Sequence, residues 1–375
     1  MCNSIALCSF DCYNIVKCCT RGDKIDYMKV KKYIVIFLVI SMSLMGCTQI
    51  GMKEYTKNIF ALNTYITLTA YGGRNTPKIL DKAVQRIQEI ENHMSTEIDT
   101  SDVALINKNA GESPVEVHDD TFYVIERALW YCNMSDGAFD ITIYPIVKLW
   151  DITGDNPRVP DEEEIQRALS LVDYTEVILD REDKTVFLNR SDMGIDLGAI
   201  AKGYAADEVV RILEKSGIRH GLLNLGGNIS VIGDKPDGTP WNIGVRDPRE
   251  EETQLQYLAI ASISNSSIVS SGDYERYIKD VYEKTGIRYH HIFDPRTGYP
   301  ADSGLIGTTV IAKDSIDADA LSTCLFIMGQ ERGLKFLQNV QGSKGICIDN
   351  TKRIYTSSGM DNILEITGEE YRLEK

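Results

Sequence analysis

The stretch VILDREDKTVFL, residues 177–188, consists of two short apolar runs on either side of the polar segment DREDK. Two apolar runs joined by a polar turn are typical of a β-hairpin, in which neighbouring strands pair antiparallel. The segment therefore predicts that at least part of the fold is an antiparallel sheet.

The patterns around this hairpin mix strands and helices without a regular order. Strands are expected over residues 60–71, 222–232, 257–263 and 308–312, and near Ile346 and Ile354. Helices are expected over residues 77–93, 121–134, 199–215 and 331–339, with a further one that begins near Asp317. Because regular βαβ alternation is missing, we predict an α+β fold with largely antiparallel sheets packed with helices. No repeat or Pro/Gly-rich linker divides residues 55–375, which we interpret as one catalytic unit.

Composition and charge limit the classes of function. The chain has 375 residues, of which 43% are hydrophobic and 25% charged, as in an ordinary globular protein. Its formal net charge is −15, which excludes steering to nucleic acid by the overall field. An anionic ligand would need a local site built from a metal, a lysine or helix N-termini.

The N-terminal part carries a targeting signal. Residues 28–47 contain three lysines, an apolar run and small residues before Cys47, the order of a secretory signal. The ending Leu-Met-Gly-Cys resembles a bacterial lipobox, so we expect an exported lipoprotein anchored at Cys47 to the outer face of the cell membrane; a plain signal peptide or an uncleaved anchor is the alternative. Residues 1–27 are interpreted as an extension before a true start at Met28, and residues 48–54 as a linker.

A carboxylate and a hydroxyl share one face of the helix in SIDADALSTCLF, residues 315–326. Asp319 and Thr323 are four residues apart, so they project side by side. Such a pair suits a hard cation such as Mg²⁺, which prefers oxygen ligands and keeps positions open for phosphates. The alternative is an ordinary helix start, with Ser315 or Asp317 as N-cap and Asp319 in the first turn.

Four further stretches interrupt the pattern of a plain core. The first, SDGAFDITIYP (135–145), has Asp140 between an expected helix end and an expected strand, and the second, GIDLGAIAKGYAAD (194–207), leads from an expected strand into a helix with Asp196, Lys202 and Asp207. The third, LNLGGNISVIG (223–233), has Gly226, Gly227 and Asn228 inside a strand pattern. The fourth, YHHIFDPRTGYP (289–300), contains His291 and Asp294. Each alone has a structural explanation, such as turn chemistry, a β-bulge or a solvated lysine. Together they supply what phosphoryl transfer needs: neutralised phosphate charge, backbone donors and a proton acceptor.

With these motifs in order, the sequence resembles the FAD:protein FMN transferases, the ApbE family of flavin transferases. The resemblance covers about residues 60–354 and rests on seven stretches: MSTEIDTSDVALIN, GAFDITIYPIVKLW, IDLGAIAKGYAAD, LNLGGNISVIG, SSGDYERY, HHIFDPRTGYP and DADALSTCLFIMG. It implies an ApbE-like, T-fold-related fold in an exported protein, often a lipoprotein. It also implies that the substrate is FAD, bound with Mg²⁺. The FMN portion of FAD would be transferred to a threonine hydroxyl of a partner protein, with release of AMP. That partner would be a redox flavoprotein of the envelope or membrane.

The resemblance also implies roles for individual residues. The metal would be held by Asp319, Thr323 and the backbone carbonyl of Ala199. The flavin nucleotide would contact Ala138, Phe139 and Asp140, its adenosine and phosphates would lie near Asp196 and Lys202, and further cofactor contacts are expected at Leu62, Glu97, Gly226, Gly227, Asn228 and Ile292. His291 is the expected general base, and Asp294 could orient its ring.

Two positions depart from the family's pattern. Leu62-Asn63-Thr64 stands where many members carry Met-Gly-Thr, and Glu97 stands where some place a tyrosine, which leaves a ring-stacking role at Glu97 open. Two other functions use the same residues: a Mg²⁺-dependent FAD pyrophosphatase, in which water replaces the threonine, and a surface lipoprotein that binds FAD without chemistry. A complete set of metal ligands, lysine and histidine argues against a pure binder, since binding alone needs no base.

Overall fold

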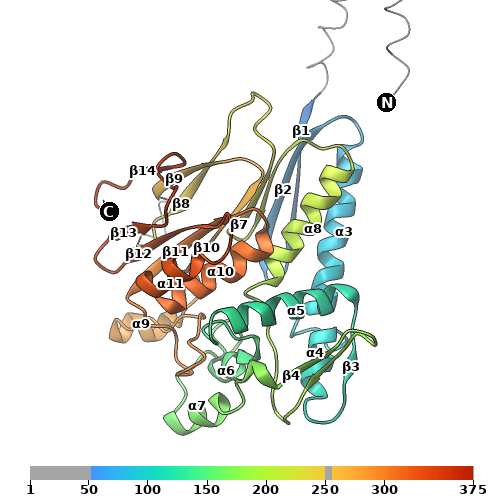
Figure 1. The fold of residues 1–375 in the computed structure, drawn as a ribbon, viewed down its shortest axis with the longest axis vertical. Coiled ribbons are helices and arrows are strands. Elements are labelled where there is room, and N and C mark those ends of the chain that lie inside the picture. The colour runs from blue at the N-terminus through green and yellow to red at the C-terminus, as the bar shows by residue number, and fades with distance from the viewer. Residues whose placement is uncertain (1–51, 250–255, 375) are drawn as a thin grey trace, which may run out of the picture. The chain divides into compact units, whose positions relative to one another are not determined.

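A nine-stranded sheet carries the fold in the computed structural model, which describes residues 52–249 and 256–374 (Figure 1). The strands, in spatial order, are β1 (Lys53–Ala61), β2 (Thr64–Gly72), β6 (His220–Leu225), β7 (Asn228–Ile232), β10 (Ser266–Gly272), β11 (Leu305–Ala312), β12 (Lys344–Asp349), β13 (Arg353–Thr356) and β15 (Arg372–Leu373). Every neighbouring pair is antiparallel except β13 and β15. The predicted α+β fold with largely antiparallel sheets is confirmed.

Two smaller sheets complete the strand pairing. One contains β14 (Leu364–Ile366), β9 (Tyr257–Ile263) and β8 (Trp241–Arg246), and the other contains β3 (Val115–Glu116), β5 (Thr185–Leu188) and β4 (Val177–Asp180). The hairpin predicted at residues 177–188 is β4 paired with β5, with Val177 opposite Leu188.

Helices cover one face of the large sheet. They are α3 (Thr76–Met94), α8 (Ala201–Lys215), α10 (Ser315–Met328) and α11 (Gln330–Leu337), while α4 (Asp102–Lys108), α5 (Asp119–Met134), α6 (Tyr144–Trp150), α7 (Glu162–Leu169) and α9 (Lys279–Thr285) lie elsewhere (Figure 1). The helical period explains the packing: Ile79, Ala83, Ile87 and Ile90 of α3 recur every three or four residues and are all buried. No helix in the described parts of the chain is long and apolar enough to cross a bilayer.

A second core lies on the other face of the large sheet. There Ile268, Ile311 and Ile348 of the large sheet belong to one buried cluster with Ile243 and Leu258 of the small sheet β14-β9-β8. Lys53–Lys375 form one compact unit. The predicted signal segment and Cys47 lie outside the described residues.

Two segments predicted as single strands are hairpins. Residues 60–71 contain the two-residue turn Leu62-Asn63 between β1 and β2, and residues 222–232 contain the turn Gly226-Gly227 between β6 and β7. All four turn residues have positive φ, between +51° and +97°, as a type I′ turn requires. The glycines therefore form a tight turn, not a bulge inside a strand. β1 is an edge strand that buries only Ala61, so its sequence does not alternate between apolar and polar residues. It begins at Lys53, inside residues 48–54, which were assigned as a linker.

Other local predictions also differ from the structure. The stretch after α5 forms a 3₁₀ turn, Ile141–Ile143, followed by α6, where a strand was expected. Residues 194–197, before α8, form no strand. The N-cap of α10 is Asp314, so neither Ser315 nor Asp317 caps it and Asp319 lies beyond the first turn. Two short strands, β14 and β15, follow the segment near Ile354 that was expected to end the chain's strands.

Candidate active site

The first turn of α8 faces the first half of α10, and this brings predicted phosphate and metal residues together. The buried carboxylate of Asp319 accepts a hydrogen bond from the backbone N–H of Gly203 through Oδ2 (2.9 Å). Lys202 Nζ lies 3.9 Å from Asp319 Oδ1 and donates to the carbonyl of Gly198 (2.7 Å). A lysine of α8 and a carboxylate of α10 therefore meet at the start of α8.

The Ala199 carbonyl lies just before α8 and has no backbone donor. Gly203 is the third residue of α8, so its N–H is one of the first-turn donors without a partner inside the helix. It donates to Asp319, and no backbone N–H of the described residues donates to the Ala199 carbonyl, which precedes the N-cap residue Ile200. The Thr323 hydroxyl, one helical turn after Asp319 on α10, has no hydrogen-bond partner in the described part of the chain.

These oxygens fit a hard divalent cation. A carboxylate, a hydroxyl and a free carbonyl are ligands that Mg²⁺ accepts, and such a site leaves positions for water and phosphate. The described residues contain no cluster of three or more His, Cys, Asp or Glu side chains able to hold a metal. Of the three residues Ala199, Asp319 and Thr323, only Asp319 has a side chain of these types. A metal held by their oxygens would need further oxygen ligands from a bound substrate or water.

The two adjacent histidines of HHIFDP have different hydrogen bonds. His290 is buried, and both of its ring nitrogens are engaged with backbone groups, Nε2 with the Ala301 carbonyl (3.0 Å) and Nδ1 with the Ile292 N–H (3.3 Å). His291 donates from Nδ1 to the Arg276 carbonyl (3.2 Å). In that tautomer Nε2 of His291 carries the lone pair. Of the two rings, only His291 offers a free proton acceptor.

The environment of His291 keeps the ring neutral. Loss of hydration lowers its pKa to about 3, and the positive charges of Arg276 and Lys202 act in the same direction. The expectation that Asp294 orients this ring is wrong. Asp294 Oδ1 and Oδ2 accept from the guanidinium of Arg296 (2.8 and 2.6 Å), and the Arg276 carbonyl is the group that orients His291.

Further charged groups surround Lys202 and His291. Burial raises the pKa of Asp196, against the opposing effects of the Gly198 N–H and of Lys202. Burial also raises the pKa of Glu275, against Arg246, Arg276 and Lys202. The side chains of Asp196, Glu275 and His291 keep contact with solvent, yet poor hydration is the largest cause of each shift. The charge of Lys202 acts on the pKa of all three groups, so they lie near this lysine.

The first hairpin turn contacts Arg276, and the second turn packs on the first. The Asn63 carbonyl of the first turn accepts from Arg276 Nη2 (2.8 Å), and the Leu62 N–H donates to Glu91 (2.6 Å). The second turn packs on the first, because a Cβ at Gly226 would lie 2.0 Å from Thr64 Oγ1. Next to Gly227, the buried Asn228 side chain has an amide Nδ2 without a hydrogen-bond partner among the residues that the structure describes. An unsatisfied buried donor fits a site that a polar ligand completes.

The segment 138–140 is placed differently. Ala138, Phe139 and Asp140 are buried in the core, and Asp140 accepts from Thr142 N–H and Oγ1 (2.8 and 2.6 Å), which fixes the following 3₁₀ turn. The neighbouring Ile141 carbonyl accepts from the Asp196 N–H (2.8 Å), which joins this segment to the residues before α8. Ile292 is also buried, and Glu97 is exposed.

Burial of Asp140 predicts a pH-dependent stability. Its pKa is raised to about 6, with burial as the largest cause, so the folded state binds this proton more tightly than the unfolded chain. The resulting contribution to the free energy of unfolding is complete below about pH 4 and is lost as the pH rises through about 6. We expect the melting temperature of Asp140→Asn, relative to the wild type, to increase between pH 4 and pH 7. A difference that stays constant over this range would contradict the assignment.

Sequence reasoning assigned no role to three residues at this site. Arg276 and Glu275 belong to SSGDYERY, which was noted only as a motif, and Tyr144 ends SDGAFDITIYP; burial, Glu97 and Asp196 raise the pKa of Tyr144. Charged residues directly after a buried strand were the available signal for Arg276 and Glu275.

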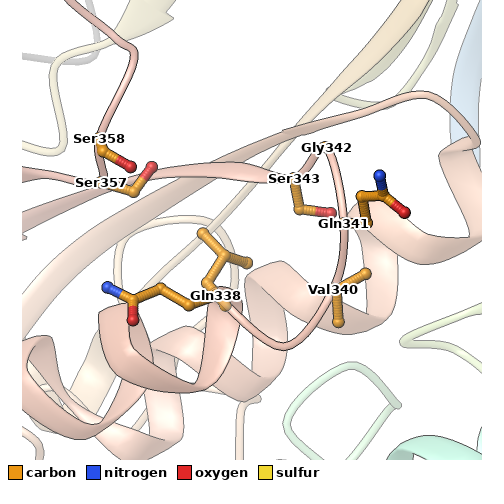
Figure 2. A pocket seen from close by; sticks show the side chains of 8 residues that line it. Gln338, Val340, Gln341, Gly342, Ser343, Ser357 and Ser358 are labelled. Carbon is orange, nitrogen blue, oxygen red and sulfur yellow. The ribbon is translucent and has the colours of Figure 1, made fainter.

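Two cavities in the described residues lie away from this site. One, of about 310 Å³, follows α11 and is lined by Gln338, Ser343, Ser357 and neighbouring residues (Figure 2). The other is lined by residues near Asp247 and Glu369. Neither contains a predicted site residue.

Comparison with known proteins agrees with the fold. Residues 62–348 match the model of the ApbE family. The FAD:protein FMN transferase of Treponema pallidum is 33% identical over 340 residues, covering 86% of this chain and 92% of that protein, and one from Klebsiella pneumoniae is 36% identical over 306 residues, covering 82% and 92%. The chain belongs to the ApbE family.

Solved structures show the same relationship. The ApbE protein of Thermotoga maritima has a TM-score of 0.76 at 33% identity, and the flavin transferase ApbE of Vibrio cholerae has a TM-score of 0.74 at 26% identity. Each match covers 83% of this chain and 99% of the other.

Proposed function

We propose that this protein transfers the FMN portion of FAD to a hydroxyl group of a partner protein, a threonine, and releases AMP. The names of its relatives support transfer of FMN from FAD to protein. One observation carries the proposal for this chain: His291, neutral and with Nε2 free, lies near enough to Lys202 for the lysine's charge to lower its pKa, and Lys202 in turn lies beside Asp319. A proton acceptor and a cation beside a metal-binding oxygen set are the groups that phosphoryl transfer requires.

We assign Mg²⁺ to the oxygens of Ala199, Asp319 and Thr323. When bound, the ion would neutralise charge on the phosphates and on the departing AMP. Lys202 adds a second positive charge there, because its ammonium lies 3.9 Å from Asp319 Oδ1. The unpartnered amide of Asn228 is a further donor for FAD.

In the proposed step, the threonine oxygen attacks the phosphorus of the FMN half. A new oxygen–phosphorus bond forms, the bond from that phosphorus to the bridging oxygen breaks, and its electron pair leaves on AMP. The threonine proton passes to Nε2 of His291. A pKa near 3 would make a weak base, but two bound phosphates place negative charge beside Arg276 and Lys202 and raise the pKa of His291. The base would therefore strengthen when the substrate binds.

The cellular setting is part of the proposal. The lysines, apolar run and Cys47 within residues 28–47 support export and a lipid anchor at the outer face of the cell membrane. A partner at that location would be a redox flavoprotein of the membrane or envelope.

The test of the proposed function is an assay with purified protein, FAD, Mg²⁺ and a candidate acceptor domain. We expect flavin fluorescence on the acceptor that survives a denaturing gel, with one AMP released per flavin attached. An acceptor whose target threonine is replaced by alanine is the control. AMP with free FMN would identify a pyrophosphatase, and tightly held FAD without AMP would identify a binding protein; either result contradicts the proposal.

A further inference from the structure

Asp207 belongs to no part of the proposed reaction, yet its side chain holds the start of α10. Its two carboxylate oxygens accept hydrogen bonds from the backbone N–H groups of Ser315 (2.7 Å) and Ile316 (2.9 Å). The N-cap residue of α10, Asp314, makes no side-chain cap. The free N–H groups at this helix start are therefore satisfied by a carboxylate from α8.

The converse contact holds the start of α8. The apolar side chain of its N-cap residue, Ile200, cannot accept a hydrogen bond. The Gly203 N–H in the first turn of α8 donates instead to Asp319 of α10. Each helix thus provides a carboxylate to the first turn of the other. We call these two contacts, at Asp207 and at Asp319, the reciprocal caps.

The helices are also in close contact where the caps form. A Cβ on Gly203 would lie 2.3 Å from the Ser315 carbonyl oxygen and 2.6 Å from the Ile316 Cα. Both are backbone atoms, so only a shift of the helix could relieve the clash. Gly203 and Asp207 are one helical turn apart on α8, so they face the same segment of α10. The contact and the caps together fix how far α10 lies from α8.

This spacing matters because the oxygens assigned to the metal come from both helices. Asp319 and Thr323 lie on α10, whereas Ala199 lies just before Ile200, the N-cap residue of α8, and its carbonyl accepts from no backbone N–H of the described residues. We propose that Asp207 is a positioning residue of the metal site, which holds α10 against α8 so that the oxygens of the two helices converge. The proposal rests on the proposed Mg²⁺ site and adds a residue that would not touch the ion.

The test replaces Asp207 by alanine and by asparagine in the full chain. Two quantities are measured with Mg²⁺ as the probe: the concentration that gives half-maximal FAD cleavage, and the rise in melting temperature that Mg²⁺ causes without FAD. Loss of a residue that orients metal ligands typically lowers metal affinity by about 10- to 100-fold. We expect the half-maximal Mg²⁺ concentration of Asp207→Ala to rise by about tenfold or more, the Mg²⁺-induced rise in melting temperature to shrink, and kcat at saturating Mg²⁺ to stay within about threefold. Asp207→Asn keeps one acceptor and should give an intermediate shift.

The matched control is Asp161→Ala. Asp161 caps α7 by accepting from the Glu164 N–H (2.8 Å), and it is not among the residues of this site. This variant loses a helix cap of the same chemistry and should keep the wild-type response to Mg²⁺.

A second variant, Gly203→Ala, leaves both carboxylates in place but forces the helices apart, and should weaken the Mg²⁺ response as Asp207→Ala does.

The outcomes separate the positioning role from the function. If Asp207→Ala and Asp207→Asn melt at lower temperature but keep the wild-type Mg²⁺ dependence, Asp207 is only a helix cap and the proposal is wrong. If the wild type transfers FMN without any response to Mg²⁺, the metal assignment itself fails, and this proposal fails with it.

Discussion

Replacing Asp319 by alanine is expected to remove the divalent-metal dependence of FAD turnover and to lower the rate by about 10³-fold or more. A bound metal supplies several kcal/mol of charge stabilisation, and about 1.4 kcal/mol corresponds to each factor of ten. The structure adds a second cause of loss. Without the Asp319 carboxylate, the Gly203 N–H loses its partner, so the hydrogen bond that holds α10 against the start of α8, beside Ala199, is lost as well.

The measurement is the rate of AMP release as a function of Mg²⁺ concentration. Asp317→Ala is the control: Asp317 lies on the same helix, but its Oδ1 accepts from Arg127 (2.7 and 3.0 Å) of α5. We expect this control to keep its Mg²⁺ dependence, with a rate within about threefold of the wild type. An Asp319→Ala protein with wild-type Mg²⁺ dependence would remove the metal assignment.

Replacing His291 by alanine is expected to slow FMN transfer by about 10²- to 10⁴-fold, the usual contribution of a general base. FAD affinity should change little, because the proposed role of the ring is to accept the proton of the attacking hydroxyl. Single-turnover transfer measures the chemistry, and quenching of flavin fluorescence measures binding.

His290→Ala provides the matched comparison. Both ring nitrogens of His290 are engaged with backbone groups inside the protein, so its loss should lower the melting temperature. The protein that remains folded should transfer FMN at close to the wild-type rate. Equal losses of FAD affinity and transfer rate in His291→Ala would instead assign His291 a structural role.

Errors in the sequence-based predictions have local causes. Asp294 stands three residues from His291, but the Asp294 carboxylate is taken by Arg296, two residues further along the same turn. The group that orients His291 is a backbone carbonyl, at Arg276, and no side-chain pattern marks a carbonyl. Gly226-Gly227 was expected inside a strand, but the two glycines form a type I′ turn. A bulge and a type I′ turn both use glycine at positive φ, so the sequence alone did not distinguish them.

The sequence by itself determined the features that depend on local geometry. The helical period places Asp319 and Thr323 on one face of α10, and the apolar runs at residues 177–188 pair as a hairpin, because backbone geometry sets both spacings. Only the tertiary structure decided which histidine is free, which carbonyl orients it and what caps each helix. Those properties depend on hydrogen bonds such as the one from Gly203 to Asp319, which joins residues 116 positions apart. Such a bond forms only when α8 packs against α10, and no local pattern along the chain encodes that contact.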